Sequence, residues 1–151
     1  MRFLIQRVKG ASVEVEHAEI GRIGQGLLVF VGVGQGDDEA VADAMIRKLL
    51  SLRIFEDENG KTNLSIRDVG GELLIVSQFT LYADCSHGNR PGFTLAGAPD
   101  VAERLYEYVI AGCAREIATV RHGEFGADMQ VQLINDGPFT ILLDSAEVVR
   151  K

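Results

Sequence analysis

Residues 2–33 have the hydrophobic pattern of several consecutive strands. Val13 and Val15 alternate with glutamates, which is typical of a strand that buries one face. A hairpin bend is predicted at 17–19, and the run at 27–31 is apolar without alternation. An unbroken apolar run of this kind indicates a strand covered on both faces. We therefore expect three strands here, the third of them central in its sheet.

Two helices are predicted to alternate with strands in the middle of the chain. Asp37 is the expected N-cap of a helix over 38–51, in which apolar residues recur at helical spacing. A second doubly covered strand is expected at 72–78. The second helix is predicted to begin at Pro99 and Asp100, because proline is tolerated in a first helical turn.

The remaining segments supply a long loop and the last strands. Residues 83–99 carry glycines, two prolines and few large apolar groups, and loops of this length are often functional. Strands are expected at 127–134 and 139–144, separated by a turn at 135–138. Over residues 1–151 the pattern predicts a single α/β domain with a mixed sheet and two main helices.

Charge and composition argue against several classes of protein. The chain has 15 Lys and Arg residues against 22 Asp and Glu, a formal net charge of −7. It lacks the overall positive field that attracts proteins to nucleic acid or to anionic membranes, which taken alone argues against an RNA partner. Cys85 and Cys113 have no metal-ligand spacing, which fits a reducing compartment and predicts no metal. No apolar stretch has the length of a signal peptide or a bilayer span, so we expect a cytoplasmic protein without cofactor, DNA or membrane partner.

Several catalytic motifs are incomplete. Glycines at 32–36 lie between a strand and a helix, but Asp37 stands where a dinucleotide fingerprint requires glycine. The acidic run at 56–58 lacks the spacing of a calcium loop. The three histidines occur without a metalloprotease or nucleophile-elbow motif. A triad assembled in space stays open, above all for His87 in the long loop.

Two polar segments are stronger candidates for a site. A buried strand ends in Ser77, Gln78 and Thr80, at the strand end where α/β sheets place ligands. These hydroxyls could equally satisfy local backbone groups. Gly137 and Pro138 leave an unhindered backbone that can be presented to a ligand, although taken alone they indicate a tight turn.

Together the segments SQFTLYAD (77–84) and NDGPFT (135–140) closely resemble the two signature motifs of the D-aminoacyl-tRNA deacylases. QRV (6–8), GLLVFVGV (26–33) and GNRPGF (88–93) stand in the same order and spacing as in that family, so the likeness covers the whole chain. The resemblance implies a homodimeric α/β domain of the order β2-(βα)2-β3 with a barrel-like core. The implied activity is hydrolysis of the ester that links a D-amino acid, or mischarged glycine, to the terminal adenosine of tRNA, as chirality proofreading in translation.

The resemblance also assigns residues to this site. It implies that the main-chain N–H groups near Phe79 and Thr80 stabilise the reacting ester, helped by the 2′-hydroxyl of the tRNA. The Thr80 hydroxyl as a covalent nucleophile is the competing mechanism, but no base stands beside it in sequence. The residues implied to line the catalytic site are Ser77, Gln78, Phe79 and Thr80.

A second group of residues is implied to select the substrate. Gly137 and Pro138, joined by a cis peptide in the family, would reach across the dimer interface and reject L-amino acids. Arg7 resembles the residue that steadies this loop, and Phe139 stands where the family commonly has valine. The residues implied for substrate binding and the chirality filter are Gly137, Pro138, Phe139, Thr140, Arg7 and Met129.

Two alternative functions remain open. One is a paralogous deacylase with a trans Gly137-Pro138 bond that acts on L-alanine attached to the wrong tRNA. The other is an RNA-binding module that keeps the fold without the chemistry. For any tRNA partner, the acidic composition predicts few phosphate contacts and a shallow salt dependence. Arg47, Lys48 and Arg53 are candidates for a local basic patch, although solvated helix charges explain them equally well.

Overall fold

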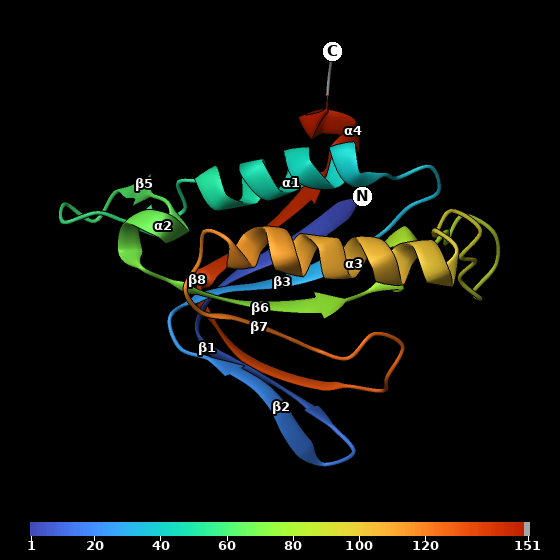
Figure 1. Cartoon of the computed structure of the whole chain (residues 1–151), viewed down its shortest axis with the longest axis horizontal. Coiled ribbons are helices and arrows are strands. Elements are labelled where there is room, and N and C mark those ends of the chain that lie inside the picture. The colour runs from blue at the N-terminus through green and yellow to red at the C-terminus, as the bar shows by residue number, and fades with distance from the viewer. Residues whose placement is uncertain (150–151) are drawn as a thin grey trace.

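The computed structural model describes residues 1–149, in which two long helices, α1 and α3, cover one face of a curved sheet (Figure 1). The main sheet has six strands in the order β2-β1-β3-β6-β7, and β8 also pairs with β1. Its strands are β1 (Arg2–Val15), β2 (Ala18–Ile23), β3 (Gly26–Gly32), β6 (Glu72–Ser77), β7 (Val120–His122) and β8 (Gln130–Asp144). The smaller sheet pairs β4 (Phe55–Glu56) with β5 (Thr62–Leu64). The helices are α1 (Glu39–Ser51), α2 (Ile66–Val69), α3 (Pro99–Ala114), α4 (Ser145–Val148) and the 3₁₀ helix η1 (Phe79–Tyr82).

The mixed α/β class and the expected element order are confirmed. The strand β3 runs parallel to β6, and β6 to β7, whereas all pairs of β1 are antiparallel. The third strand is central, as expected, and Leu27, Leu28 and Val29 are completely buried. Counting β8 as two segments gives two strands, two strand-and-helix units and three closing strands, the implied order.

The sheet curls into a nearly closed barrel because β1 changes partners along its length. Its first half pairs with β3 and its second half with β2, while β8 follows the other side. This curvature brings β2 next to β6 and β7. A Cβ added to Gly21 would lie 3.3 Å from the carbonyl oxygen of His122 and 3.4 Å from the Leu74 side chain. The barrel-like core implied by the resemblance is therefore present.

The bend between β1 and β2 is tighter than the sequence predicts. Glu16 and His17 adopt positive φ angles of 50° and 66°. Ala18 and Glu19, expected in the bend, already belong to β2. A two-residue hairpin turn with both φ angles positive matches the twist of its strands. Asparagine and glycine usually occupy such turns, so Glu16 and His17 give no sequence signal for this one.

The prediction of Asp37 as the N-cap of α1 is wrong by one residue. The Asp38 side chain accepts from the Val41 N–H at 3.0 Å, so Asp38 caps the helix. Asp37 is instead drawn inward, where its carboxylate accepts the Gly34 N–H and pairs with the amino group of Met1. Asp37 and Asp38 are equally good N-cap residues by type, so the sequence does not distinguish them. The tertiary contacts of Asp37 leave Asp38 as the cap.

The two long helices pack closely over the core. Met45 and Leu49 of α1 and Leu105 and Val109 of α3 are completely buried. A Cβ added to Gly112 would lie 2.6 Å from Ile46 Cδ1, so glycine lets the helices approach at this point. The predicted start of α3 at Pro99 is confirmed.

The two strands expected near the C-terminus are one strand with a wide bulge. Gln6 of β1 faces Thr140, but Val8 faces Asn135, so residues 136–139 stand opposite Arg7 alone. We call residues 136–139 the β8 bulge. The strand also begins later than expected, at Gln130. Sequence patterns detect the turn residues of such a bulge but not the ladder that continues on both sides.

No helix within residues 1–149 is long and apolar enough to cross a membrane. The same residues contain no cluster of three or more His, Cys, Asp or Glu side chains able to hold a metal ion. Cys85 is exposed and Cys113 is buried, and burial raises the pKa of Cys113 to about 12.

Candidate active site

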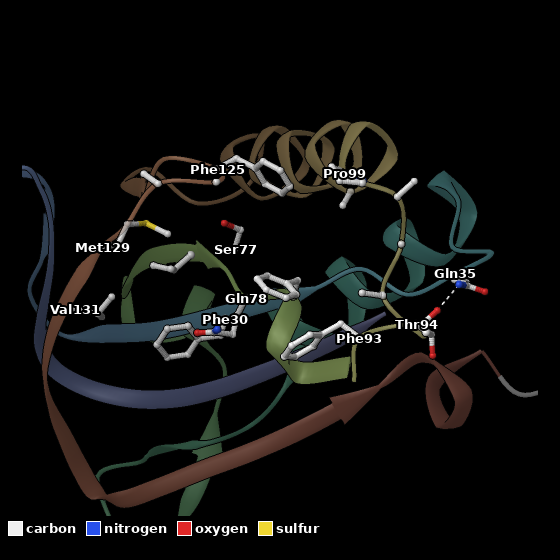
Figure 2. Close-up of a pocket in the computed structure, with 18 residues that line it drawn as sticks. Phe30, Gln35, Ser77, Gln78, Phe93, Thr94, Pro99, Phe125, Met129 and Val131 are labelled. Carbon is white, nitrogen blue, oxygen red and sulfur yellow. Dashed lines mark hydrogen bonds between the residues drawn. The ribbon is translucent and has the colours of Figure 1, made fainter. Parts of the chain in front are cut away.

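A cavity of about 780 Å³ opens at the carboxyl end of β6 (Figure 2). Ser77, Gln78, Phe79 and Met129 line it, together with Phe30 of β3, most of the segment 93–99 of the long loop and several residues between 125 and 131. The Ser77 hydroxyl points into the cavity, on the side where Phe125 and Met129 lie (Figure 2). The first sequence motif and the long loop therefore meet at one site.

The parallel pairing of β3 with β6 creates this position. Val31 stands opposite Ser77, where β6 ends. The Gln78 N–H then donates to the Val31 carbonyl at 2.8 Å, and the chain turns at once into η1. Strand ends of this kind leave a crevice that α/β proteins use for ligands.

An aromatic pair forms one side of the cavity. Phe79 and Phe93 pack edge to face, with ring centroids 4.9 Å apart. Phe79 is 57% exposed and Phe93 is 38% exposed. Large apolar surface left open beside a cavity is typical of a ligand site, and these rings can stack on a flat base.

The start of η1 presents main-chain donors. The Leu81 N–H donates to the Gln78 carbonyl at 3.2 Å, which closes the first turn. The N–H groups before that bond, those of Phe79 and Thr80, have no partner inside the helix. Neither of them donates a hydrogen bond within residues 1–149. Phe79 lines the cavity and Thr80 follows it in the chain. Main-chain donors that face a reacting ester can stabilise a developing oxyanion.

The Thr80 hydroxyl has no general base beside it. Its oxygen accepts a hydrogen bond from the side-chain amide of Gln78. Within residues 1–149 no histidine or carboxylate forms a hydrogen bond with this hydroxyl. A nucleophilic threonine would need such a base.

The triad left open for His87 does not form in the described part of the chain. His87 Nδ1 lies 2.8 Å from Ser86 Oγ, but the carboxylate of Asp84 bonds to the serine instead of the imidazole. A triad requires the carboxylate to orient the histidine. The bonds from the Ser86 hydroxyl and N–H hold the pKa of Asp84 below its usual value. All three residues therefore act as an ordinary loop turn.

The β8 bulge is held by a buried arginine. Arg7 is 6% exposed, and its Nε donates to the Asp136 carbonyl at 3.0 Å while Nη1 donates to the Ile54 carbonyl at 2.7 Å. Its guanidinium lies 4.7 Å from the centroid of the Phe139 ring. A Cβ added to Gly137, whose φ is +136°, would lie 3.1 Å from Arg7 Nη2. The bulge therefore requires glycine at this position.

Further hydrogen bonds fix the far side of the bulge. Asn135 Oδ1 accepts the Phe139 N–H at 2.7 Å, and Asn135 Nδ2 donates to Thr140 Oγ1 at 2.8 Å. Gln6 also donates to the Thr140 hydroxyl, at 3.3 Å. The bond between Gly137 and Pro138 is cis, the state that the resemblance implies.

The cavity and the β8 bulge lie in different parts of one chain. Arg7 stands opposite Leu27, which pairs with Leu73, four residues before Ser77 on β6. The β8 bulge and Ser77 are therefore separated by three strand spacings of about 4.8 Å across the sheet and by about 13 Å along β6. Met129, predicted for substrate binding or the chirality filter, lines the cavity.

Comparison with known proteins identifies the family. The model of the D-Tyr-tRNA(Tyr) deacylase family matches residues 4–144. The chain belongs to this family. A D-aminoacyl-tRNA deacylase of Thermosipho africanus is 54% identical over 148 residues, covering 98% of this chain and 99% of its own. One of Heliobacterium modesticaldum is 56% identical over 144 residues, covering 95% and 96%.

Two solved structures share the deacylase-family fold. The c-Myc DNA Unwinding Element Binding Protein superposes with a TM-score of 0.91 at 41% identity, covering 95% of this chain and 98% of its own. A probable eukaryotic D-amino acid tRNA deacylase superposes with a TM-score of 0.77 at 20% identity, covering 94% and 97%. The second likeness shows the fold alone. The family resemblance read from the two motifs is thus confirmed.

Proposed function

We propose that this chain is a hydrolase that cleaves the ester between a D-amino acid and the terminal adenosine of tRNA. The observation that carries the proposal is the cavity at the end of β6, which is lined by Ser77, Gln78 and the aromatic pair of Phe79 and Phe93. The names of the curated relatives support the same activity. Release of free tRNA and D-amino acid would make the enzyme a proofreader of chirality in translation.

In the proposed mechanism the protein mainly positions the ester. Phe79 and Phe93 hold the adenosine, and the N–H groups of Phe79 and Thr80 bind the oxyanion that forms when water attacks. An aminoacyl ester is already activated, so positioning and one or two donors supply much of the required rate. A donor of this kind lowers the activation barrier by about 2.7–4 kcal/mol. The 2′-hydroxyl of the terminal ribose assists the attacking water.

The chirality filter is proposed to come from a second copy of the chain. The β8 bulge is rigidly held by Arg7 but lies far from the cavity of its own chain. In a homodimer the backbone at Gly137 and Pro138 would enter the partner's cavity. There it would clash with an L side chain, whereas a D side chain and glycine would pass.

The proposed activity can be tested with a matched pair of cavity variants. D-aminoacyl-tRNA is incubated with the native protein, with Ala127→Trp and with Ala18→Trp, and release of the amino acid is followed. Ala127 lines the cavity, whereas Ala18 is exposed on β2. We expect the native protein and Ala18→Trp to hydrolyse the ester, and Ala127→Trp to lose most turnover. Equal turnover by both variants would place the reaction elsewhere.

One structural neighbour supplies a competing function. The name of the c-Myc DNA Unwinding Element Binding Protein describes DNA binding by that protein. The net charge of −7 does not favour a DNA surface on this chain. Titration of duplex DNA under the conditions of the tRNA assay separates the two functions. We expect saturable binding of aminoacyl-tRNA and none of DNA.

A further inference from the structure

The long loop is pinned beside the aromatic pair of the cavity. Asp84 and Gly92 exchange two main-chain hydrogen bonds, with N–O distances of 2.7 and 2.9 Å. The segment 85–91 therefore leaves and returns at one point, just after η1 and just before Phe93. Arg90 precedes Phe93 by three residues, which separates their Cα atoms by at most about 10–11 Å even in an extended chain. A ligand held by Phe93 is therefore close to this segment.

Arg90 is an exposed cation to which the structure gives no anionic partner. Between residues 83 and 99 it is the single Lys or Arg, and Asp84 is the single carboxylate. The Asp84 carboxylate accepts the Ser86 N–H at 2.9 Å and the Ser86 hydroxyl at 2.6 Å. No side chain of residues 1–149 forms an ion pair with Arg90. Its guanidinium can therefore form the paired hydrogen bonds that arginine makes with phosphate.

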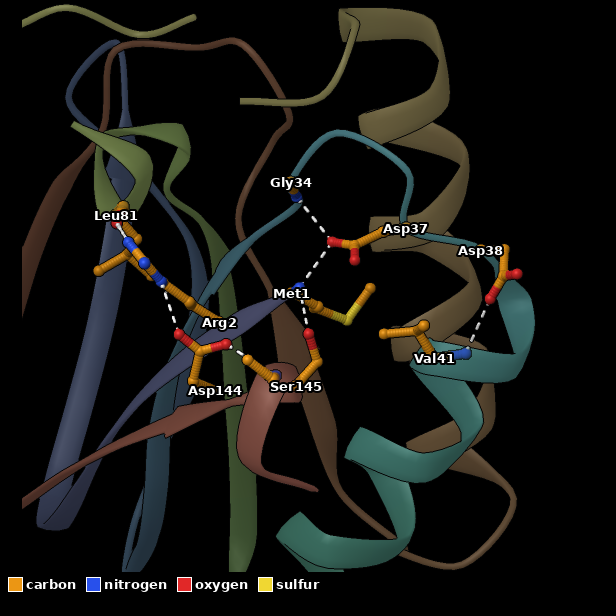
Figure 3. A network of polar contacts seen from close by, with 10 residues as sticks. Met1, Arg2, Gly34, Asp37, Asp38, Val41, Leu81, Asp144 and Ser145 are labelled. Carbon is orange, nitrogen blue, oxygen red and sulfur yellow. Dashed lines mark hydrogen bonds and ion pairs between the residues drawn. The ribbon is translucent and has the colours of Figure 1, made fainter. Parts of the chain in front are cut away.

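Two arginines on neighbouring elements already have partners. Arg2 Nε donates to Asp144 Oδ2 at 3.0 Å, and its Nη1 donates to the Leu81 carbonyl of η1 at 2.7 Å (Figure 3). Arg104 of α3 pairs with Glu39 of α1 at 3.1 Å. Neither guanidinium can bind a phosphate without giving up these contacts.

The basic patch predicted from the sequence lies far from the cavity. Arg47 and Lys48 stand towards the C-terminal end of α1, and Arg53 follows the helix. Figure 1 shows this end of α1 beside α2 and β5, whereas the long loop and the carboxyl end of β6 lie at the other end of the molecule. The patch is therefore placed for parts of a tRNA remote from the ester.

The two ends of the cavity differ in charge. Figure 2 shows Met129 and Val131 at one end and Phe93 and Thr94 at the other. Beyond the first end, a smaller cavity of about 410 Å³ shares Ala127 with the large one. Its titratable side chains are four carboxylates and one imidazole, those of Glu14, Glu16, Glu124, Asp128 and His17. Carboxylates repel a phosphodiester, so the anionic strand of a nucleic acid is favoured at the Phe93 end.

We propose that Arg90 binds the phosphodiester on the 5′ side of the terminal adenosine of tRNA. The inference rests on the proposed deacylation, in which Phe79 and Phe93 hold that adenosine. The ribose that carries the ester also carries this phosphate at its 5′ oxygen, so a phosphate stands next to the bound nucleoside in every tRNA. Pro91 restricts Arg90 to extended backbone, which lowers the entropy lost on contact. Arg90 is thus a substrate-binding residue that orients the strand over the long loop.

The kinetic test compares three D-aminoacyl substrates that differ in their phosphates. They are the 3′ ester of adenosine, the 3′ ester of adenosine 5′-monophosphate, and the charged tRNA. For the native protein we expect the 5′-phosphate to raise kcat/KM about fivefold or more over the adenosine ester, mainly through KM, because hydrogen bonds between charged groups are the strong ones. Arg90→Gln should lose this gain and still cleave the adenosine ester at the native rate.

Lys61→Gln is the matched control for this experiment. It also removes one positive charge, but from the exposed turn between β4 and β5. We expect native kinetics from it on all three substrates. If Arg90→Gln lost equal activity on the adenosine and 5′-monophosphate esters, Arg90 would not act through the phosphate. Native kcat/KM of Arg90→Gln on all three substrates would equally overturn the proposal.

The salt dependence of tRNA binding tests the same contact without turnover. Each phosphate contact with a single strand contributes about −0.7 to the slope of log affinity against log salt. We expect the slope to be shallower by about 0.7 for Arg90→Gln and native for Lys61→Gln. An unchanged slope for Arg90→Gln would contradict the contact. If the native protein cleaved none of the three esters, the proposed function would fail, while this binding measurement would still test Arg90.

Discussion

The main-chain donors of Phe79 and Thr80 determine which substitutions the proposed reaction tolerates. Thr80→Ala keeps the N–H and removes the hydroxyl, so we expect kcat within about tenfold of the native value. Thr80→Pro removes the N–H, and loss of one oxyanion donor typically lowers kcat about 10²- to 10³-fold. Single-turnover deacylation measures both. If Thr80→Ala lost as much activity as Thr80→Pro while fold and tRNA binding survived, the hydroxyl would be the reacting group.

Arg7 is the residue on which the β8 bulge depends. Arg7→Ala leaves the carbonyls of Asp136 and Ile54 without their donor, at about 1–3 kcal/mol for the buried Ile54 carbonyl and less for the partly exposed Asp136 carbonyl. Arg7→Lys keeps the charge but cannot reproduce two directed bonds. We expect both variants to unfold at lower urea concentration and to discriminate less between D and L esters. Full discrimination by a folded Arg7→Ala protein would show that the bulge is not the filter.

At the scale of elements, the cap of α1 can be tested by adjacent substitutions. Asp38→Ala removes the bond to the Val41 N–H and should lower the free energy of unfolding by about 1 kcal/mol. Asp38→Asn keeps a good capping side chain and serves as the control. Urea denaturation measures all three proteins. A native-like stability of Asp38→Ala would mean that the helix does not rely on this cap.

The elements with strong periodicity could be predicted from sequence, and those fixed by tertiary contacts could not. The unbroken apolar run of β3 and the helical spacing in α1 each indicate one structure. By contrast, β7 has three residues and η1 four, too few for a periodic signal. The continuity of β8 across its bulge depends on pairing with β1, which no local pattern reveals.

The candidate site was predictable only as far as its motifs extend. The segment 77–80 marks the cavity, but its aromatic partner Phe93 comes from the long loop and carries no periodic signal. The sequence predicts Asp37 as a helix N-cap and shows that it replaces the glycine of a dinucleotide-binding turn. Its partner is the amino group of Met1, which residue types do not reveal. The prediction of Met129 for substrate binding has no local pattern behind it, and the structure places Met129 in the lining of the cavity.

At the scale of the whole molecule, acid and alkaline pH should destabilise the fold for different reasons. Hydrogen bonds from Lys61, Ser65 and Ser86 lower the pKa values of Asp57, Asp68 and Asp84, respectively, in the folded state. Their contribution is therefore present above the unfolded pKa and lost as pH falls below about 4. Burial raises the pKa values of Tyr82 and Tyr106, so their contribution is lost as pH rises above about 10. Urea midpoints measured from pH 2 to 11 should fall at both ends, and a midpoint that rises towards pH 3 would contradict these contacts.

The acidic composition constrains how the whole molecule holds tRNA. The candidate basic patch consists of Arg47, Lys48 and Arg53. Arg47 and Lys48 are exposed on α1, whereas Arg53 donates a hydrogen bond to the Asn63 carbonyl, so the patch is small. Three phosphate contacts would give a slope of about −2 to −3 for log affinity against log salt. Filter binding between 50 and 200 mM salt, about the range where steep binders lose most affinity, measures this slope. A slope near −6 or steeper would require a basic surface that the composition does not provide.

The central claim is that one cavity hydrolyses D-aminoacyl esters and excludes their L counterparts. The most direct measurement is kcat/KM for the D and L esters of one amino acid on one tRNA, taken with a single protein preparation. We predict rapid hydrolysis of the D ester and a rate for the L ester no higher than that of the uncatalysed reaction. Equal rates for the two esters, or hydrolysis of the L ester alone, would contradict the account.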